Sequence, residues 1–236
     1  MEAHSMQVIG ADHAVMYTKG GNSMESRAIK IYAPMNKRIA MKIIPGHFAT
    51  GNSHINQYID LTTMKTRMSE AAEAARVLAK QYVNSTIVDT IVCLDGCEVI
   101  GAFLAQELSS AGIRSMNMHQ TIYIITPEFN TNGQMIFRNN LQPAVYGKNI
   151  LLLAASATTG DTLKRSLECI RYYGGMVQGI STIFSAVDKI DGNLVNSIFT
   201  AKDIPDYRSY NIGECPLCKG KQRLEAIVNG YGYMKL

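Results

Sequence analysis

The segment from Asn149 to Tyr173 has residue types in the order that a phosphate-binding site requires. A short apolar run, Ile150–Leu153, precedes the turn Thr158–Thr162, which holds three threonines and Gly160, and a helical pattern follows. A strand, a Gly/Thr turn and a helix bring hydroxyl groups, free N–H groups and the positive end of the helix dipole together. The segment therefore predicts an anion site. The alternative is an ordinary strand-to-helix connection in which threonines cap the helix.

A second group of candidate residues lies near the C-terminus, in the sequence Cys215-Pro216-Leu217-Cys218 with Gly220 after it. This spacing has the form of a zinc half-site. Complete coordination would need Cys93, Cys97, a histidine brought in by folding, or a second subunit. A free surface pair and a redox pair are the alternatives, and the five histidines show no metal-ligand spacing of their own.

Composition and charge exclude several classes of protein. The chain has 236 residues, of which 47% are hydrophobic and 18% are charged, as expected of a compact protein with a core. The net charge of +4 is scattered, so we expect no nucleic-acid partner. No apolar run has the length of a membrane span, and no secretory signal is visible, so we expect no membrane partner. Five scattered cysteines favour a reducing, cytoplasmic location.

Strand-like and helix-like segments alternate from Ile29 onward. Glycine and proline mark the ends of several of them, and an Asn132-Gly133 turn predicts a hairpin. The predicted strands are 39–44, ended by Pro45-Gly46, then 58–61, 86–94, 121–126, 134–138, 150–153 and 176–184, and the predicted helices are 66–83, 99–110 and one that starts after Thr162.

This alternation predicts an α/β fold with a mainly parallel central sheet covered by helices on both faces. We expect a leader at residues 1–28, flexible or of foreign origin. An α/β domain should occupy residues 29–200, with 29–65 as an N-terminal cap, and a C-terminal extension with the CxxC pair should occupy residues 201–236.

The candidate phosphate turn resembles a family signature. In type I phosphoribosyltransferases a hydrophobic strand leads into two acidic residues, two small or apolar residues and Thr-x-Gly-x-Thr/Ser, which binds the 5′-phosphate of 5-phosphoribosyl 1-diphosphate (PRPP). Here the strand is Leu151–Leu153, and the loop consists of Thr158, Thr159, Gly160, Asp161 and Thr162. The resemblance implies the type I phosphoribosyltransferase fold, with a small N-terminal hood and a C-terminal extension.

The resemblance covers residues 29–183 and is greatest to the orotate phosphoribosyltransferases. The segments 45–48 and 53–60 resemble their base-binding segment, which implies that Phe48, Ser53, His54 and Asn56 contact the base. Residues 94–98 occupy the place of the pyrophosphate loop, formed here by Asp95, Gly96 and Cys97, and Arg138 lies on the returning strand of the hood hairpin.

Three positions depart from the family pattern. The acidic pair, which binds the ribose hydroxyls in the family, is replaced by Ala154 and Ala155. The hood segment 126–134 lacks the usual arginine and lysines. Ser53 stands where the base-binding motif has lysine or arginine, and Asn56 where it has proline. Each departure removes a group that the transfer reaction would use.

The resemblance implies an enzyme that transfers phosphoribose from PRPP to a nucleobase, with Mg²⁺ and as a homodimer. Arg138 and Asp95 are the candidate catalytic residues, although Arg138 could instead be a solvated charge at a sheet edge. Asp161 could hold the metal or simply cap the helix. The nucleobase expected first is orotate. The alternative function is a binding module that senses PRPP or a nucleoside 5′-monophosphate without turning it over.

Overall fold

The computed structural model describes residues 24–110, 115–118, 121–131 and 133–236. Most of the predicted leader, residues 1–23, and Asn132 of the predicted hairpin turn lie outside the described residues. The chain forms two compact units: unit 1 comprises residues 1–62 and 202–236, and unit 2 comprises residues 63–201. The C-terminal segment, predicted as a separate extension, therefore shares a unit with the N-terminal strands.

Unit 2 is built around a six-stranded sheet with the order β10-β11-β9-β8-β4-β5. All neighbours in this sheet are parallel except the β10–β11 pair. The predicted, mainly parallel sheet is thus present. The strands are β4 (Thr90–Cys93), β5 (Tyr123–Ile125), β8 (Asn149–Ala157), β9 (Met176–Ser185), β10 (Lys189–Ile190) and β11 (Asn193–Thr200).

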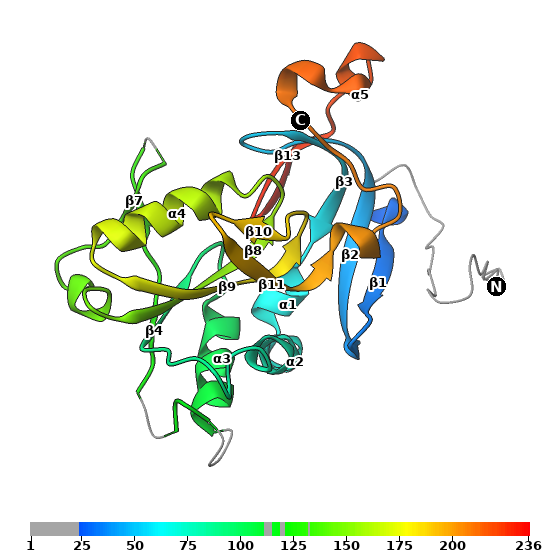
Figure 1. Cartoon of the computed structure of the whole chain (residues 1–236). Helices are drawn as coiled ribbons and strands as arrows, with labels where there is room; N and C mark the ends of the chain where they lie inside the picture. Colours follow the sequence, from blue (N-terminus) through cyan, green and yellow to red (C-terminus); the bar gives the residue numbers. More distant parts are fainter. Residues whose placement is uncertain (1–23, 111–114, 119–120, 132) are drawn as a thin grey trace. The chain divides into compact units, whose positions relative to one another are not determined.

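Helices cover both faces of this sheet (Figure 1). Helix α4 (Asp161–Tyr172) packs on β8 and β9, whereas α2 (Met68–Ala79) and α3 (Glu98–Ser110) pack on each other and on β11, β4 and β5. The short α1 (Thr62–Thr66) precedes α2, and a 3₁₀ turn, η3 (Gln142–Ala144), precedes β8.

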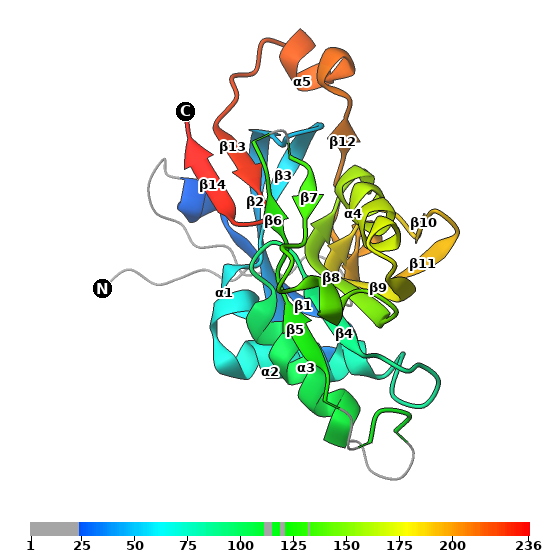
Figure 2. The same cartoon turned by 90° about the vertical axis from the view of Figure 1, so that its left-hand side faces the viewer.

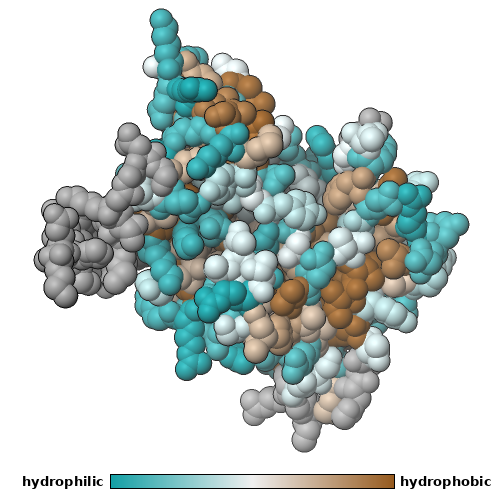
Figure 3. Space-filling model, turned by 180° about the vertical axis from the view of Figure 1, so that it is seen from behind, coloured by the Kyte–Doolittle hydropathy of each residue, from teal (hydrophilic) through white to brown (hydrophobic). Residues whose placement is uncertain are grey.

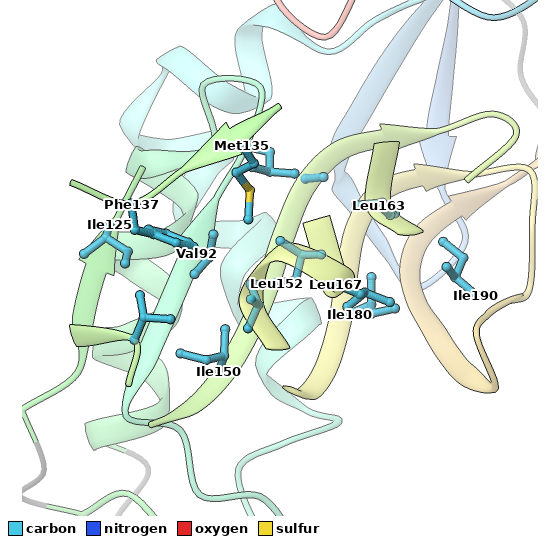
Figure 4. Packing of buried hydrophobic residues seen from close by; sticks show 14 of the residues in the cluster. Val92, Ile125, Met135, Phe137, Ile150, Leu152, Leu163, Leu167, Ile180 and Ile190 are labelled. Carbon is cyan, nitrogen blue, oxygen red and sulfur yellow. The ribbon is translucent and has the colours of Figure 1, made fainter. Parts of the chain in front are cut away.

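A hydrophobic core lies between α4 and the sheet. Leu163 and Leu167 of α4 meet Leu152 and Ile180 of the sheet, and all four are buried (Figure 4). Apolar residues recur at every third or fourth position of α4 and form one buried face. The packing of this face on the sheet fixes the position of α4 relative to β8. The core thereby fixes the turn between β8 and α4, where the predicted phosphate loop lies.

Unit 1 contains a second sheet, with the order β12-β3-β2-β13-β14 and with β1 paired to β2. Residues from both ends of the chain form it, and β13 runs parallel to β2. Its strands are β1 (Ile29–Ala33), β2 (Asn36–Ala49), β3 (His54–Asp60), β12 (Ser209–Tyr210), β13 (Ala226–Asn229) and β14 (Gly232–Lys235); α5 (Pro216–Lys219) and the 3₁₀ turns η1 (Met24–Arg27), η4 (Ala201–Asp203) and η5 (Ile212–Glu214) complete the unit.

The prediction that Pro45-Gly46 ends a strand is wrong. Strand β2 continues through both residues to Ala49, and its pairing with β3 shifts register between Pro45 and Phe48. A proline, which lacks the N–H that a sheet ladder uses, is tolerated at such an irregularity. The shift places His47 between two regular parts of the β2–β3 pairing.

In the described ranges, no helix is long and apolar enough to cross a membrane. The face of the molecule in Figure 3 is mostly hydrophilic, and apolar side chains gather on it in a few patches. Large apolar residues with more than a third of their surface exposed include Val99, Tyr123, Ile124 and Phe129 of unit 2. Tyr123 and Ile124 belong to β5, an edge strand of the described sheet.

Candidate phosphate site and a cysteine–histidine cluster

The predicted phosphate loop connects β8 to α4. Strand β8 ends at Ala157, and α4 begins at Asp161 with Gly160 as its N-cap residue. Gly160 has a φ of 86°, a left-handed conformation that glycine adopts without strain. Because a glycine offers no side-chain oxygen, the first N–H groups of α4 are left to a loop side chain or a ligand. The geometry is that of a helix N-terminal anion site.

Asp161 and Thr159 contact each other inside this loop. The Thr159 hydroxyl donates a hydrogen bond of 2.8 Å to Oδ2 of Asp161, and the Asp161 N–H lies 3.4 Å from the same hydroxyl oxygen. Asp161 is the first helical residue and not the N-cap. Its exposed carboxylate lies at the positive end of α4, where a negative charge stabilises the helix.

Ala154 and Ala155 lie within β8, and each is 1% exposed. Ala154 belongs to the apolar core between the sheet and α4. Successive side chains of a strand point to opposite faces, so Ala155 faces away from this core. A carboxylate at position 154 would enter an apolar environment.

The predicted pyrophosphate loop follows β4. Asp95 and Gly96 both have positive φ angles, 57° and 76°, which produces a sharp turn before α3. Lys65 of α1, which is 6% exposed, donates a hydrogen bond of 2.9 Å from Nζ to the backbone carbonyl of Asp95. A buried cation therefore stabilises the strained turn.

The Asp95 carboxyl group is half-buried, and burial raises its pKa. Lys65 and the backbone N–H of Ala155 act in the opposite direction on the same pKa, so both lie close to this carboxyl group. Cys93 and Cys97, on either side of the turn, are fully buried, and burial raises the pKa of both thiols. They therefore act as small buried residues that pack the turn.

The predicted hood hairpin is present as β6 (Glu128–Phe129) and β7 (Met135–Ile136). Arg138, two residues beyond β7, forms two hydrogen bonds with Glu128, of 2.6 Å from Nε and 2.7 Å from Nη2. The contact lowers the pKa of Glu128 and raises that of Arg138. The candidate pyrophosphate ligand is thus paired with an acid of its own hairpin.

The four residues of the predicted base-binding segment are engaged in contacts within unit 1. Phe48 is fully buried against Tyr58, and Ser53 closes a tight turn with Thr50. Asn56 donates a 2.7 Å hydrogen bond to the carbonyl of Asp206 and accepts one of 2.7 Å from the N–H of residue 208. His54 is 6% exposed.

His54 belongs to a group of four potential metal ligands: His47, His54, Cys215 and Cys218, whose ligand atoms all lie within 4.8 Å of one another. The two histidine nitrogens, Nε2 of His47 and Nδ1 of His54, are 3.2 Å apart. All members of this cysteine–histidine cluster except Cys218 are buried. Burial and the facing His47 lower the pKa of His54. The predicted half-site at the CxxC pair is therefore joined by two histidines and not by Cys93 or Cys97.

Sequence reasoning assigned neither Lys65 to the Asp95 turn nor His47 and His54 to the cysteine pair. Lys65 could not be placed, because its contact with Asp95 spans thirty residues and depends on the packing of α1. His47 and His54 lack metal-ligand spacing as a pair, and they meet the cysteines because β13 pairs with β2. The signal that could have found His47 is its position as the one polar side chain in the apolar stretch 43–49; His54 lies among polar residues and has no such signal.

The fold is that of one class of protein, the type I phosphoribosyltransferases. Leishmania donovani UMP synthase has a TM-score of 0.50 and 18% sequence identity with this chain, over 68% of this chain and 34% of that protein. This likeness concerns the fold. No family model matches the chain.

The individual proteins to which the chain is similar are orotate phosphoribosyltransferases. It is 25% identical over 193 residues to that of Desulforamulus reducens, with 80% of this chain and 90% of the relative covered. It is also 25% identical over 210 residues to that of Pelotomaculum thermopropionicum, with 85% and 96% covered. The resemblance predicted from the motifs is confirmed, and the names of these relatives support the expectation of an enzyme.

Proposed function

We propose that this protein transfers the 5-phosphoribosyl group of PRPP to a nucleobase, orotate, and releases pyrophosphate. The observation that carries the proposal is the loop between β8 and α4, with Gly160 in a left-handed conformation at the helix N-terminus. The similarity to orotate phosphoribosyltransferases over 80–85% of the chain supports it. The reaction would serve the synthesis or salvage of pyrimidine nucleotides.

The loop would bind the 5′-phosphate of PRPP. The hydroxyls of Thr158, Thr159 and Thr162 and the N–H groups of the first turn of α4 are donors suited to phosphate oxygens. The Thr159 hydroxyl donates its one proton to Asp161, so it would have to turn from that carboxylate to donate to the phosphate. These donors recognise the phosphate of PRPP and of a nucleoside 5′-monophosphate equally well.

Transfer breaks the bond between the anomeric carbon and a pyrophosphate oxygen and forms a bond from that carbon to a ring nitrogen of the base. The proton of the ring nitrogen goes to solvent. Positive charge develops at the sugar, and a carboxylate placed there lowers the barrier. We propose Asp95 for this role, because the backbone N–H of Ala155, at the position of the family's acidic pair, acts on its carboxyl group. Arg138 would face the leaving pyrophosphate.

The donors present suit the Mg²⁺ that the resemblance implies. Mg²⁺ is held by one or two carboxylates together with substrate phosphates, and needs no cage of protein ligands. Asp95 and Asp161 are such carboxylates, and Glu98 is a third, which accepts a 2.8 Å hydrogen bond from Thr126. Mg²⁺ would neutralise the charge of the leaving pyrophosphate.

The replacement of the family's acidic pair by Ala154 and Ala155 favours a second candidate function. Because the side chains of Ala154 and Ala155 are almost fully buried and have no polar atom, neither side chain could bind the ribose hydroxyls. A protein with the phosphate loop but without these carboxylates could bind PRPP or a nucleoside 5′-monophosphate as a sensor.

The proposal includes a homodimer and a cytoplasmic location. Tyr123 and Ile124 of the edge strand β5 and Val99 of α3 are exposed apolar residues of the kind that association would cover. Sedimentation of the purified protein would measure the oligomeric state. A monomer at all accessible concentrations would contradict this part of the proposal.

Calorimetry of PRPP binding, with and without Mg²⁺, tests the proposal, followed by pyrophosphate release with a panel of bases. Binding of PRPP and release with orotate is the expected result. Binding of PRPP without release of pyrophosphate for any base would contradict the transferase function and support the sensor function. Absence of binding to PRPP and to nucleoside 5′-monophosphates would contradict both functions.

A further inference from the structure

We propose that His47, His54, Cys215 and Cys218 form a structural zinc site that attaches the C-terminal segment of unit 1 to strands β2 and β3. His47 lies on β2 and His54 begins β3, whereas Cys215 is the N-cap residue of the short helix α5 and Cys218 lies within that helix. In Figure 2, α5 lies at the same end of unit 1 as the turn between β2 and β3. All four ligands come from unit 1.

The spacing of the ligand atoms fits a tetrahedral zinc ion. With zinc bonds of about 2.3 Å to sulfur and about 2.05 Å to nitrogen, a tetrahedron has edges of about 3.3 Å between nitrogens and about 3.6 Å between sulfur and nitrogen. The nitrogens of His47 and His54 are 3.2 Å apart. Cys218 Sγ lies 3.6 Å from His47 Nε2 and 3.3 Å from His54 Nδ1, and Cys215 Sγ lies 3.5 Å from His47 Nε2.

The orientation of His47 is that of a metal ligand. Its Nδ1 lies 2.9 Å from the backbone carbonyl of Gln222, which can only accept a hydrogen bond. The proton of a neutral imidazole therefore resides on Nδ1, and Nε2 directs its lone pair to the two sulfurs and to His54. A second partner on the distal nitrogen is usual for histidines that bind metals.

The backbone around the cysteines has the form of a knuckle. The N–H of Lys219 bonds to the carbonyl of Cys215 at 3.2 Å, and the N–H of Lys221 bonds to that of Cys218 at 2.9 Å. Gln222, whose carbonyl accepts from His47, donates its own N–H to Leu217 at 2.9 Å. One short segment thus supplies two sulfur ligands and the carbonyl that orients a histidine.

The donor set favours a structural zinc ion. Two sulfurs and two nitrogens at tetrahedral spacing select zinc, and four protein ligands leave no open position for a substrate. A redox pair of cysteines would not need two buried histidines directed at its sulfurs. The exposed edge at Cys218 gives the ion a route of entry.

Metal analysis of the full-length protein and of a Cys218→Ser variant tests the proposal. Cys218 is exposed, so serine should be tolerated there, and Cys169→Ser, at a half-buried cysteine of unit 2, is the matched control. After expression with zinc and gel filtration in a mild chelator, we expect one zinc per chain in the wild type and in Cys169→Ser. We expect at least a tenfold lower content in Cys218→Ser.

Cobalt substitution and thermal melting provide independent readouts. Co²⁺ bound to the wild type should give visible bands of a tetrahedral ion and a sulfur-to-metal charge-transfer band, both lost in His54→Asn. A strong chelator should lower the melting temperature of the wild type and of Cys169→Ser, and leave that of Cys218→Ser unchanged. Zinc-free wild type that takes up no Co²⁺, or equal zinc in Cys218→Ser, would overturn the proposal.

Discussion

Arg138 and Glu128 form an ion pair across the hood hairpin, through hydrogen bonds of 2.6 Å and 2.7 Å. Arg138 is the basic residue that we assign to the leaving pyrophosphate, and about half or more of each side chain is exposed. Pairs at such exposure are weak, because water and salt screen them. A highly charged pyrophosphate can therefore compete with Glu128 for the guanidinium group.

Glu128→Gln is expected to strengthen PRPP binding several-fold. Without the competing carboxylate, the guanidinium group of Arg138 is available to bind the pyrophosphate group of PRPP. Arg138→Gln, in contrast, should weaken PRPP binding. Calorimetry with Mg²⁺ at low and high salt would measure both effects, and the gain should shrink as salt rises.

The matched control for this prediction is Glu70→Gln. Glu70 of α2 pairs at 2.9 Å with Arg67, the N-cap residue of that helix and no part of the hairpin, so its neutralisation should leave PRPP affinity unchanged. Equal affinity of Glu128→Gln and the wild type would contradict a role for Arg138 in binding.

Gly160→Ala should abolish phosphate binding and lower stability. The residue has a φ of 86°, and a Cβ there would lie 3.2 Å from Cδ1 of Ile190. A left-handed alanine costs about 1–2 kcal/mol. Gly192→Ala is the control, because Gly192 has a φ of 80° and open space around it. Both variants should melt at lower temperature, and Gly160→Ala alone should lose nucleotide binding in calorimetry.

Ala154→Asp should destabilise the protein and not restore a family-like site. Its carboxylate would enter the apolar core beneath α4, and an unpaired buried charge costs about 3 kcal/mol or more. Urea unfolding would measure the free energy of unfolding of this variant and of Ala154→Ser, which adds a polar group without a charge. We expect a smaller loss of stability for serine than for aspartate. A stable Ala154→Asp protein with faster transfer would show that position 154 faces the ligand.

Asp95→Asn should raise stability above acidic pH and abolish transfer. Since the pKa of Asp95 is raised by folding, its contribution to stability is complete below the unfolded pKa and is lost as pH rises through the folded pKa. Asparagine does not ionise, so the variant does not lose stability as pH rises. Asparagine also tolerates the φ of 57° at this position. The two proteins should be equally stable in acid and diverge on going to neutral pH.

Urea unfolding at several pH values would measure this divergence. Asp206→Asn, at another aspartate with a positive φ of 56°, controls for the preference of asparagine for this conformation. A stability difference that does not change with pH would contradict burial of the Asp95 charge.

Much of unit 2 follows from local sequence. The Ala-rich pattern of 66–83 and the pattern of 99–110 correspond to α2 (Met68–Ala79) and α3 (Glu98–Ser110), because helix propensity and apolar spacing agree there. The continuous β2 was missed, because Pro45-Gly46 ends most strands and is tolerated here through a register shift. The pairing of β13 with β2 depends on residues almost two hundred positions apart, which no local pattern reveals.

The candidate sites likewise contain parts that the local sequence predicts and parts that it does not. The loop at Thr158–Thr162 could be predicted, because a β–α connection of this kind is encoded by consecutive residues. The pairing of Lys65 with Asp95 and the meeting of His54 with Cys218 could not be predicted, because each joins segments that only the folded chain brings together.

The most direct test of the proposed function is the conversion of labelled orotate to a nucleotide by the purified protein with PRPP and Mg²⁺. We predict that labelled nucleotide and pyrophosphate form in equal amounts, and that Asp95→Asn forms neither while it still binds PRPP. PRPP binding by the wild-type protein without nucleotide formation from orotate would contradict the proposed transfer.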